Sequence, residues 1–172
     1  SVRGTFGLVP AVVDAVARIP VVAAGAVADG RGLAAALMLG AEGVLMGTRF
    51  AASAESDWND ALKQGAVAAA ADDTLQTRVF DVVRGVAWPT HFPGRAVRND
   101  FSARWHGRED ELAARQAEVN AGYDATATGD LSTRVLWAGE GVDLVSDVPS
   151  ARDIVARTVA EAERAMAGRR PG

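Results

Sequence analysis

The chain has 172 residues, 49% of them hydrophobic and 23% charged, which is the composition of a globular domain with its own core. A formal charge of −4 gives no electrostatic attraction to nucleic acid or to an anionic membrane, and the lack of cysteine excludes disulfides and thiolate metal sites. No apolar run approaches the roughly 20 residues of a membrane span. We therefore expect a cytoplasmic protein that binds neither nucleic acid nor membrane.

The first part of the chain predicts a loop, a helix and a strand. Residues 1–7 form the predicted loop, and apolar residues then recur with a helical period over residues 9–18. Pro10 suits the first turn of this helix. Pro20 ends the helix and precedes a short apolar strand over residues 21–24.

A second helix and a second strand follow directly. Asp29-Gly30 predicts a turn and the start of a helix rich in alanine and leucine, and Gly40 is expected to end it as a C-terminal cap. Residues 44–46 form the second predicted strand. Because unbroken apolar strands between helices are typical of a parallel sheet covered on both faces, the sequence predicts an α/β fold.

The pattern changes after residue 52, where helices dominate. The predicted elements are a helix over about residues 58–70, short extended pieces within 74–88, a loop over 89–94, a charged helix over 107–122, a linker over 126–130, an irregular stretch over 131–145 and a final helix from the Ser150 cap to Met166. Lys63, the only lysine, lies in the first of these helices. It is the one candidate for a Schiff base, and we predict a solvated surface residue instead.

Small residues follow each of the two predicted strands. Gly25 and Ala26 come after the first strand, and Gly47 and Thr48 come after the second. Such residues let main-chain amides approach a phosphate group, and a helix that starts near Asp29 would add its positive end. The alternative is that the glycines serve only close packing of strand against helix, and the spacing leaves both interpretations open.

These residues belong to a longer pattern that resembles a known family. Residues 20–32, PVVAAGAVADGRG, and residues 40–50, GAEGVLMGTRF, resemble the flavin-phosphate segment of the nitronate monooxygenase family, once called 2-nitropropane dioxygenases. The resemblance continues in LVPAVVDAV at residues 8–16, in PGRAVRNDF at 93–101 and in WAGEGV at 137–142. It covers most of the chain.

The resemblance implies an FMN-dependent oxidoreductase on a TIM-type (β/α) barrel that oxidises nitronates or nitroalkanes with molecular oxygen. Residues 1–52 would be the C-terminal part of the FMN-binding barrel, and residues 53–172 a mainly helical appendage that packs on it. The cofactor-binding positions that it implies are Gly25, Ala26, Leu45, Met46, Gly47 and Thr48.

Two of these positions depart from the family pattern. The family usually has glycine where this chain has Ala26, which costs roughly 1–2 kcal/mol if the backbone there has a positive φ angle. The family often has glutamine where this chain has Leu45, so one side-chain contact to the flavin is expected to be absent.

The resemblance assigns no catalytic residue and no metal ligand to this chain. The family's catalytic histidine, in a Gly-Gly-His stretch, is expected upstream of Ser1, and we predict that His91 and His106 are surface residues. The four tryptophans are expected to pack rather than to contact a flavin. Two predicted strands cannot close a barrel that needs eight, so we expect the chain to depend on a missing N-terminal half or on a second copy of itself.

The sequence is also compatible with two alternatives to a nitronate monooxygenase. One is the FMN-type enoyl-acyl-carrier-protein reductase, whose barrel is similar and whose phosphate segment does not differ. The other is a non-catalytic module that binds flavin or phosphate and needs a partner. Nitronate-dependent oxygen uptake and NAD(P)H-dependent enoyl reduction distinguish the two enzymes, and flavin binding without turnover distinguishes the module.

Overall fold

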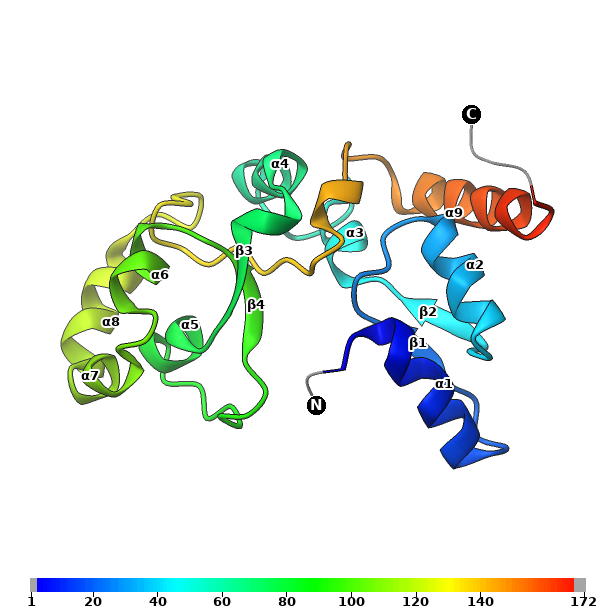
Figure 1. The fold of residues 1–172 in the computed structure, drawn as a ribbon. Coiled ribbons are helices and arrows are strands. Elements are labelled where there is room, and N and C mark those ends of the chain that lie inside the picture. The colour runs from blue at the N-terminus through cyan, green and yellow to red at the C-terminus, as the bar shows by residue number, and fades with distance from the viewer. Residues whose placement is uncertain (1–2, 169–172) are drawn as a thin grey trace.

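A computed structural model describes residues 3–168, which form two lobes connected through a central region (Figure 1). The first lobe, here the strand lobe, comprises α1 (Thr5–Val16), β1 (Val22–Ala24), α2 (Gly30–Met38), β2 (Gly43–Leu45) and α9 (Ala151–Met166). The second, here the helical lobe, comprises β3 (Thr74–Thr77), α5 (Val79–Val83), β4 (Gly94–Val97), α6 (Asp100–Trp105), α7 (Glu109–Ala114) and α8 (Gln116–Ala125). Between them lie α3 (Gly47–Ala51), α4 (Asp60–Ala68) and the 3-10 helices η1 (Ala71–Asp73) and η2 (Val142–Leu144).

The strand lobe has the predicted α/β arrangement. β1 and β2 pair in parallel, with Val22 opposite Gly43 and Ala24 opposite Leu45. One face of the pair is buried, because Ala23 packs in a cluster with Val9, Ala36 and Ala41 of the surrounding segments. The other face is open: Val22 is 56% exposed and Leu45 is 66% exposed.

The first helix starts earlier than the sequence pattern predicts. α1 begins at Thr5, because the amides of Gly7 and Leu8 both donate to the carbonyl of Gly4, over 3.1 and 3.0 Å. The predicted loop is therefore wrong for residues 5–7, while residues 1–2 lie outside the described part of the chain. Pro10 lies inside the helix rather than in its first turn. Its missing N–H leaves the carbonyl four residues earlier without a helical donor.

The predicted ends of the second helix are confirmed. The Asp29 side chain caps α2 by accepting from the amides of Arg31 and Gly32, over 3.0 and 3.1 Å. Gly40 follows the helix with a φ angle of +93°, a conformation that glycine adopts at little cost. These two local signals fix the length of the helix between the strands.

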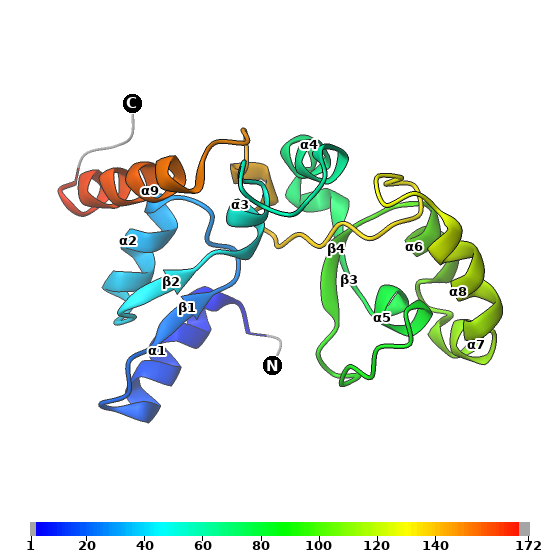
Figure 2. The ribbon, with the colours of Figure 1, turned by 180° about the vertical axis from the view of Figure 1, so that it is seen from behind.

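The last helix returns to the strand lobe and packs against α2, and the two lie side by side in both views (Figure 1 and Figure 2). Ser150 caps α9 by accepting from the amide of Asp153, as predicted. The amide of Gly30 donates to a carboxylate oxygen of Glu161 over 2.9 Å. The contact is close, because a Cβ at Gly30 would lie 2.5 Å from the amide nitrogen of Ala162.

The core of the helical lobe is aromatic. Its buried residues are Val79, Phe80, Val83, Ala96, Phe101, Trp105, Leu112 and Tyr123. The prediction of short extended pieces within residues 74–88 is wrong for residues 79–83, which form α5. The Thr77 hydroxyl accepts from the amide of Val79 at the start of this helix, over 3.2 Å. Burial of three side chains on one helical face overrides the strand preference of a valine-rich sequence.

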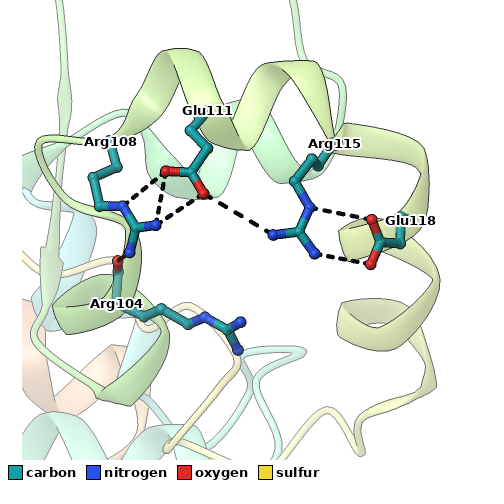
Figure 3. A network of polar contacts seen from close by, with 5 residues as sticks. All are labelled: Arg104, Arg108, Glu111, Arg115 and Glu118. Carbon is teal, nitrogen blue, oxygen red and sulfur yellow. Dashed lines mark hydrogen bonds and ion pairs between the residues drawn. The ribbon is translucent and has the colours of Figure 1, made fainter.

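The charged helix predicted over residues 107–122 is two helices. The backbone at Arg115, with φ −112° and ψ 16°, leaves the helical range and separates α7 from α8. Figure 3 shows the polar contacts at this corner, where Arg108 pairs with Glu111 and Arg115 pairs with Glu118. Both pairs are largely exposed, so each is expected to contribute little to stability.

Lys63 is buried, contrary to the predicted solvated position. Only 7% of it is exposed, and its ammonium group donates to the carbonyl of Ala54 over 3.1 Å. The amide of Ala54 in turn donates to the carbonyl of Pro149, which brings the late segment over the start of this region. The residue thus has a structural role. In the described part of the chain, no helix is long and apolar enough to cross a bilayer.

Candidate functional site

The ends of β1 and β2 meet at one pocket. The turn after β1 and the start of α3 after β2 both line a hollow of about 240 Å³. Its walls are formed by Ala24, Gly25, Ala26, Val27, Ala28, Leu45, Gly47, Thr48, Gly139 and Gly141. Most of these residues are glycine or alanine, so the main chain itself forms much of the surface. None of the described residues that line it carries a charge.

Five of the six sequence-predicted positions lie together at this pocket. Gly25 and Ala26 form one wall, and Leu45, Gly47 and Thr48 form another. Met46 is not among the lining residues; it precedes the first turn of α3 and provides no side-chain cap there. The amides of that first turn therefore receive nothing from the Met46 side chain.

The turn after β1 has an unusual backbone. Gly25 has a φ angle of +108° and Ala26 one of +57°. Glycine tolerates this region, whereas an alanine there costs roughly 1–2 kcal/mol. The departure from the family pattern at Ala26 is thus a strained position.

Replacing Ala26 by glycine is expected to stabilise the protein by about 0.5–1 kcal/mol. Glycine removes the strain of roughly 1–2 kcal/mol, and the greater freedom of the unfolded chain offsets roughly 0.5–1 kcal/mol of that gain. Urea unfolding measures the difference. Ala156→Gly, at an exposed position inside α9, is the matched control and is expected to destabilise by about 1 kcal/mol. A loss of stability in Ala26→Gly would contradict the strain.

The third wall comes from a segment that sequence reasoning did not assign to the site. The amide of Gly139 donates to the Thr48 hydroxyl oxygen over 3.0 Å. A Cβ at Gly141 would lie 3.0 Å from the carbonyl oxygen of Ala26, so a larger residue there would press on the turn after β1. Glu140 between them points to an ion pair with Arg95 instead. The two glycines in WAGEGV are the sequence feature from which this third wall could have been predicted.

The residue that follows Thr48 in the sequence is a buried arginine. Arg49 in α3 has a side chain only 7% exposed, and it pairs with Asp147 over 3.1 Å. Burial lowers the pKa of its guanidinium, and the charge of Asp147 opposes that effect. Asp147 also accepts from Arg157 of α9, and this hydrogen bond is the largest cause that lowers the pKa of the Asp147 carboxyl group. No local pattern in the sequence indicated this pairing across 98 positions.

Stability is expected to fall with the protonation of Asp147. Because its folded pKa is lowered, the ionised form stabilises the protein above the unfolded pKa of about 3.9, and this contribution is lost as the pH falls through the folded value. The free energy of unfolding should therefore differ most between the native chain and Asp147→Asn at pH 7. The difference should narrow below about pH 4. The measurement is urea unfolding over this pH range, and a constant difference would contradict the shift.

The two histidines lie away from the pocket walls. The His91 ring contacts that of Phe92, with centroids 4.2 Å apart, in the loop before β4. His106 follows α6, where its Nδ1 lies 3.2 Å from the Thr77 hydroxyl. Neither histidine is among the residues that line the pocket. Residues 3–168 also contain no group of three or more potential side-chain metal ligands.

A larger hollow, of about 430 Å³, lies on the helical lobe. Its lining includes Phe101, Arg104, Trp105, Arg115 and Glu118, and none of the predicted cofactor-binding positions. Arg115 and Glu118 already pair with each other there. The pocket at the strand ends is therefore the candidate site.

Comparison with protein families gives one match that spans most of the chain. The family model described as nitronate monooxygenase matches residues 1–161. The nitronate monooxygenase npaC of Metarhizium robertsii is 38% identical over 167 residues, which cover 91% of this chain and 45% of that protein. A probable nitronate monooxygenase of Staphylococcus saprophyticus is 35% identical and covers 95% of this chain and 44% of its own length.

Two solved structures share the fold. FabK from Thermotoga maritima superposes with a TM-score of 0.81 at 34% identity, covering 98% of this chain and 51% of that one. The nitroalkane oxidase from Streptomyces ansochromogenes gives a TM-score of 0.72 at 27% identity, covering 96% and 45%. The chain thus spans about half the length of the relatives that it matches.

Proposed function

This chain belongs to the nitronate monooxygenase family, and we propose that it carries the FMN-phosphate-binding half of a flavin-dependent oxidoreductase. The observation that carries this proposal is the shared pocket at the ends of β1 and β2, with its walls of glycine and alanine. Parallel strands of barrel enzymes present phosphate sites at such ends.

The residues of the pocket suit a phosphate group. Thr48 accepts from the amide of Gly139, so its own hydroxyl proton is available to donate to an anion. Gly47 and Thr48 begin α3, and the amides of a first helical turn have no acceptor inside the helix. At about 240 Å³ the pocket is smaller than the roughly 300–1,000 Å³ of sites that enclose whole ligands. It therefore suits the phosphate end of FMN rather than the whole cofactor.

The open face of the strand pair supports a partial barrel. Val22 and Leu45 are exposed where a closed barrel would bury them. We propose that residues 1–52 are the C-terminal part of an FMN-binding TIM-type barrel and that residues 53–172 pack on it, as α9 does on α2. The remaining strands would come from the half of the relatives' length that this chain does not match, or from a second copy.

The proposed reaction is the oxidation of alkyl nitronates with molecular oxygen. The flavin supplies the electron transfer between nitronate and oxygen when it is bound. The part of this chain is to bind and orient: the glycine and alanine walls admit the phosphate, and Thr48 donates to it. No residue of this chain is assigned a catalytic role.

A second candidate is an FMN-type enoyl-acyl-carrier-protein reductase. It is favoured by the likeness to FabK, which exceeds that to the nitroalkane oxidase in both TM-score, 0.81 against 0.72, and identity, 34% against 27%. Nitronate-dependent oxygen uptake would support the first candidate, and NAD(P)H-dependent reduction of an enoyl thioester the second. Flavin binding without either activity would support a binding module that needs a partner.

The phosphate proposal is tested by comparing FMN with riboflavin, which lacks the phosphate. Titration of the chain against flavin fluorescence is expected to give at least about tenfold tighter binding of FMN, since a hydrogen bond to a charged group contributes about 1.5–3 kcal/mol. Inorganic phosphate should compete with FMN. Equal affinities for the two flavins would overturn the proposal.

A further inference from the structure

We infer that Arg49 is a positioning residue for the phosphate pocket: its buried guanidinium fixes α3, and with it Thr48, against the segment of residues 139–149. This inference rests on the proposed phosphate site. Arg49 does not line the pocket itself, so its effect on a ligand passes through the backbone of α3.

The guanidinium of Arg49 connects the end of α3 to the late segment of the chain. Nη1 donates to a carboxylate oxygen of Asp147 over 3.1 Å, and Nη2 donates to the main-chain carbonyl of the same residue. Nη2 also donates to the carbonyl of Ala52 over 3.2 Å, just after the end of α3. The side chain therefore holds the end of its own helix and the late segment at once.

The same late segment also contacts the neighbouring residue of α3. The amide of Gly139 donates to the Thr48 hydroxyl, while Asp147 accepts from Arg49. Two adjacent residues of a five-residue helix are thus bound to the two ends of one segment, which passes beside α3 through η2 (Figure 1). A helix this short has little stability of its own, so these contacts determine its position.

The contacts of the Arg49 guanidinium lie in a buried environment. The side chain of Arg49 is 7% exposed, and its Nε is buried without a hydrogen-bond partner in the described structure. An arginine in this environment remains charged and offers a planar set of donors that lysine does not reproduce. By contrast, Arg157 binds the other oxygen of Asp147 from the surface, with 57% of its side chain exposed. The two arginines thus share one carboxylate but differ in burial, which provides a matched control.

The test measures affinity for FMN and for riboflavin in parallel. In Arg49→Gln the FMN affinity is expected to fall at least about tenfold while the riboflavin affinity changes less than about twofold, because only the phosphate contacts depend on α3. The control Arg157→Gln should change both affinities less than about threefold. In a folded Arg49→Gln protein, an equal fall in the two affinities would overturn the inference.

Two milder variants keep the test decisive if Arg49→Gln does not fold. Arg49→Lys keeps the charge but cannot reach Asp147 and Ala52 together, and Asp147→Asn keeps the shape of the acceptor without its charge; each should reduce the preference for FMN about three- to tenfold. Near-UV circular dichroism checks that each variant is folded. A native preference for FMN that persists in these folded variants rejects the role of Arg49 alone. No preference in the native chain rejects the phosphate site as well.

Discussion

Replacing Gly30 by alanine is expected to destabilise the protein by about 1–3 kcal/mol, the usual cost of inserting a group into a close-packed contact. A Cβ at this position would lie 2.5 Å from the amide nitrogen of Ala162 and nearer still to the carbonyl oxygen of Thr158. Both atoms belong to the backbone of α9, so no side-chain rotation can make room. α9 must move away from α2, and the hydrogen bond from the Gly30 amide to Glu161 lengthens with it.

The measurement is the midpoint and slope of urea unfolding for Gly30→Ala, with Gly7→Ala as the matched control. Gly7 lies inside α1, and a Cβ there would meet nothing within 4 Å. Since alanine is the better helix former, Gly7→Ala should stabilise by about 0.5–1 kcal/mol. Opposite signs for the two substitutions are expected. A Gly30→Ala protein as stable as the native chain would show that α2 and α9 are not in close contact.

The second large effect is expected at Thr48. Valine has the shape of threonine without its hydroxyl group, so Thr48→Val removes the proposed donor to the phosphate. A hydrogen bond to a charged group contributes about 1.5–3 kcal/mol, so FMN affinity should fall about 10- to 100-fold. The amide of Gly139 also loses its acceptor, at a cost of about 1–3 kcal/mol if no water replaces it.

Fluorescence titration with FMN and riboflavin separates these effects. Riboflavin affinity should stay within about threefold in Thr48→Val, because the phosphate contact is absent for that ligand. Thr48→Ser retains the hydroxyl and is expected to bind FMN within about threefold of the native chain. If Thr48→Val bound FMN as tightly as Thr48→Ser, the hydroxyl group would have no part in phosphate binding.

The sequence predicted the strand–helix–strand unit well because its signals are local. Asp29 and Gly40 mark the ends of α2 by contacts with their own neighbours, and Ser150 does the same for α9. The residues after each strand could be placed together because parallel neighbouring strands end at the same edge. These inferences need no knowledge of distant segments.

The features that could not be predicted depend on contacts across the whole chain. Gly139 joins Thr48 across 91 positions, and Asp147 joins Arg49 across 98. Local composition was even misleading at α5, where buried valines form a helix, and at Lys63, whose polar neighbours concealed a buried ammonium group. In each case the tertiary environment, rather than the local sequence, determined the outcome.

The packing of α9 on α2 also has a consequence for how the molecule is made. The strand lobe combines α2 with the much later α9, so a nascent polypeptide emerging from the ribosome exposes the Gly30 surface until α9 has been translated. Contacts between such distant segments form slowly, and the helical lobe has every residue that it needs much earlier. Translation thus completes the helical lobe before the strand lobe, and the proposed phosphate pocket, which needs residues 139–141, becomes complete only after the helical lobe has emerged.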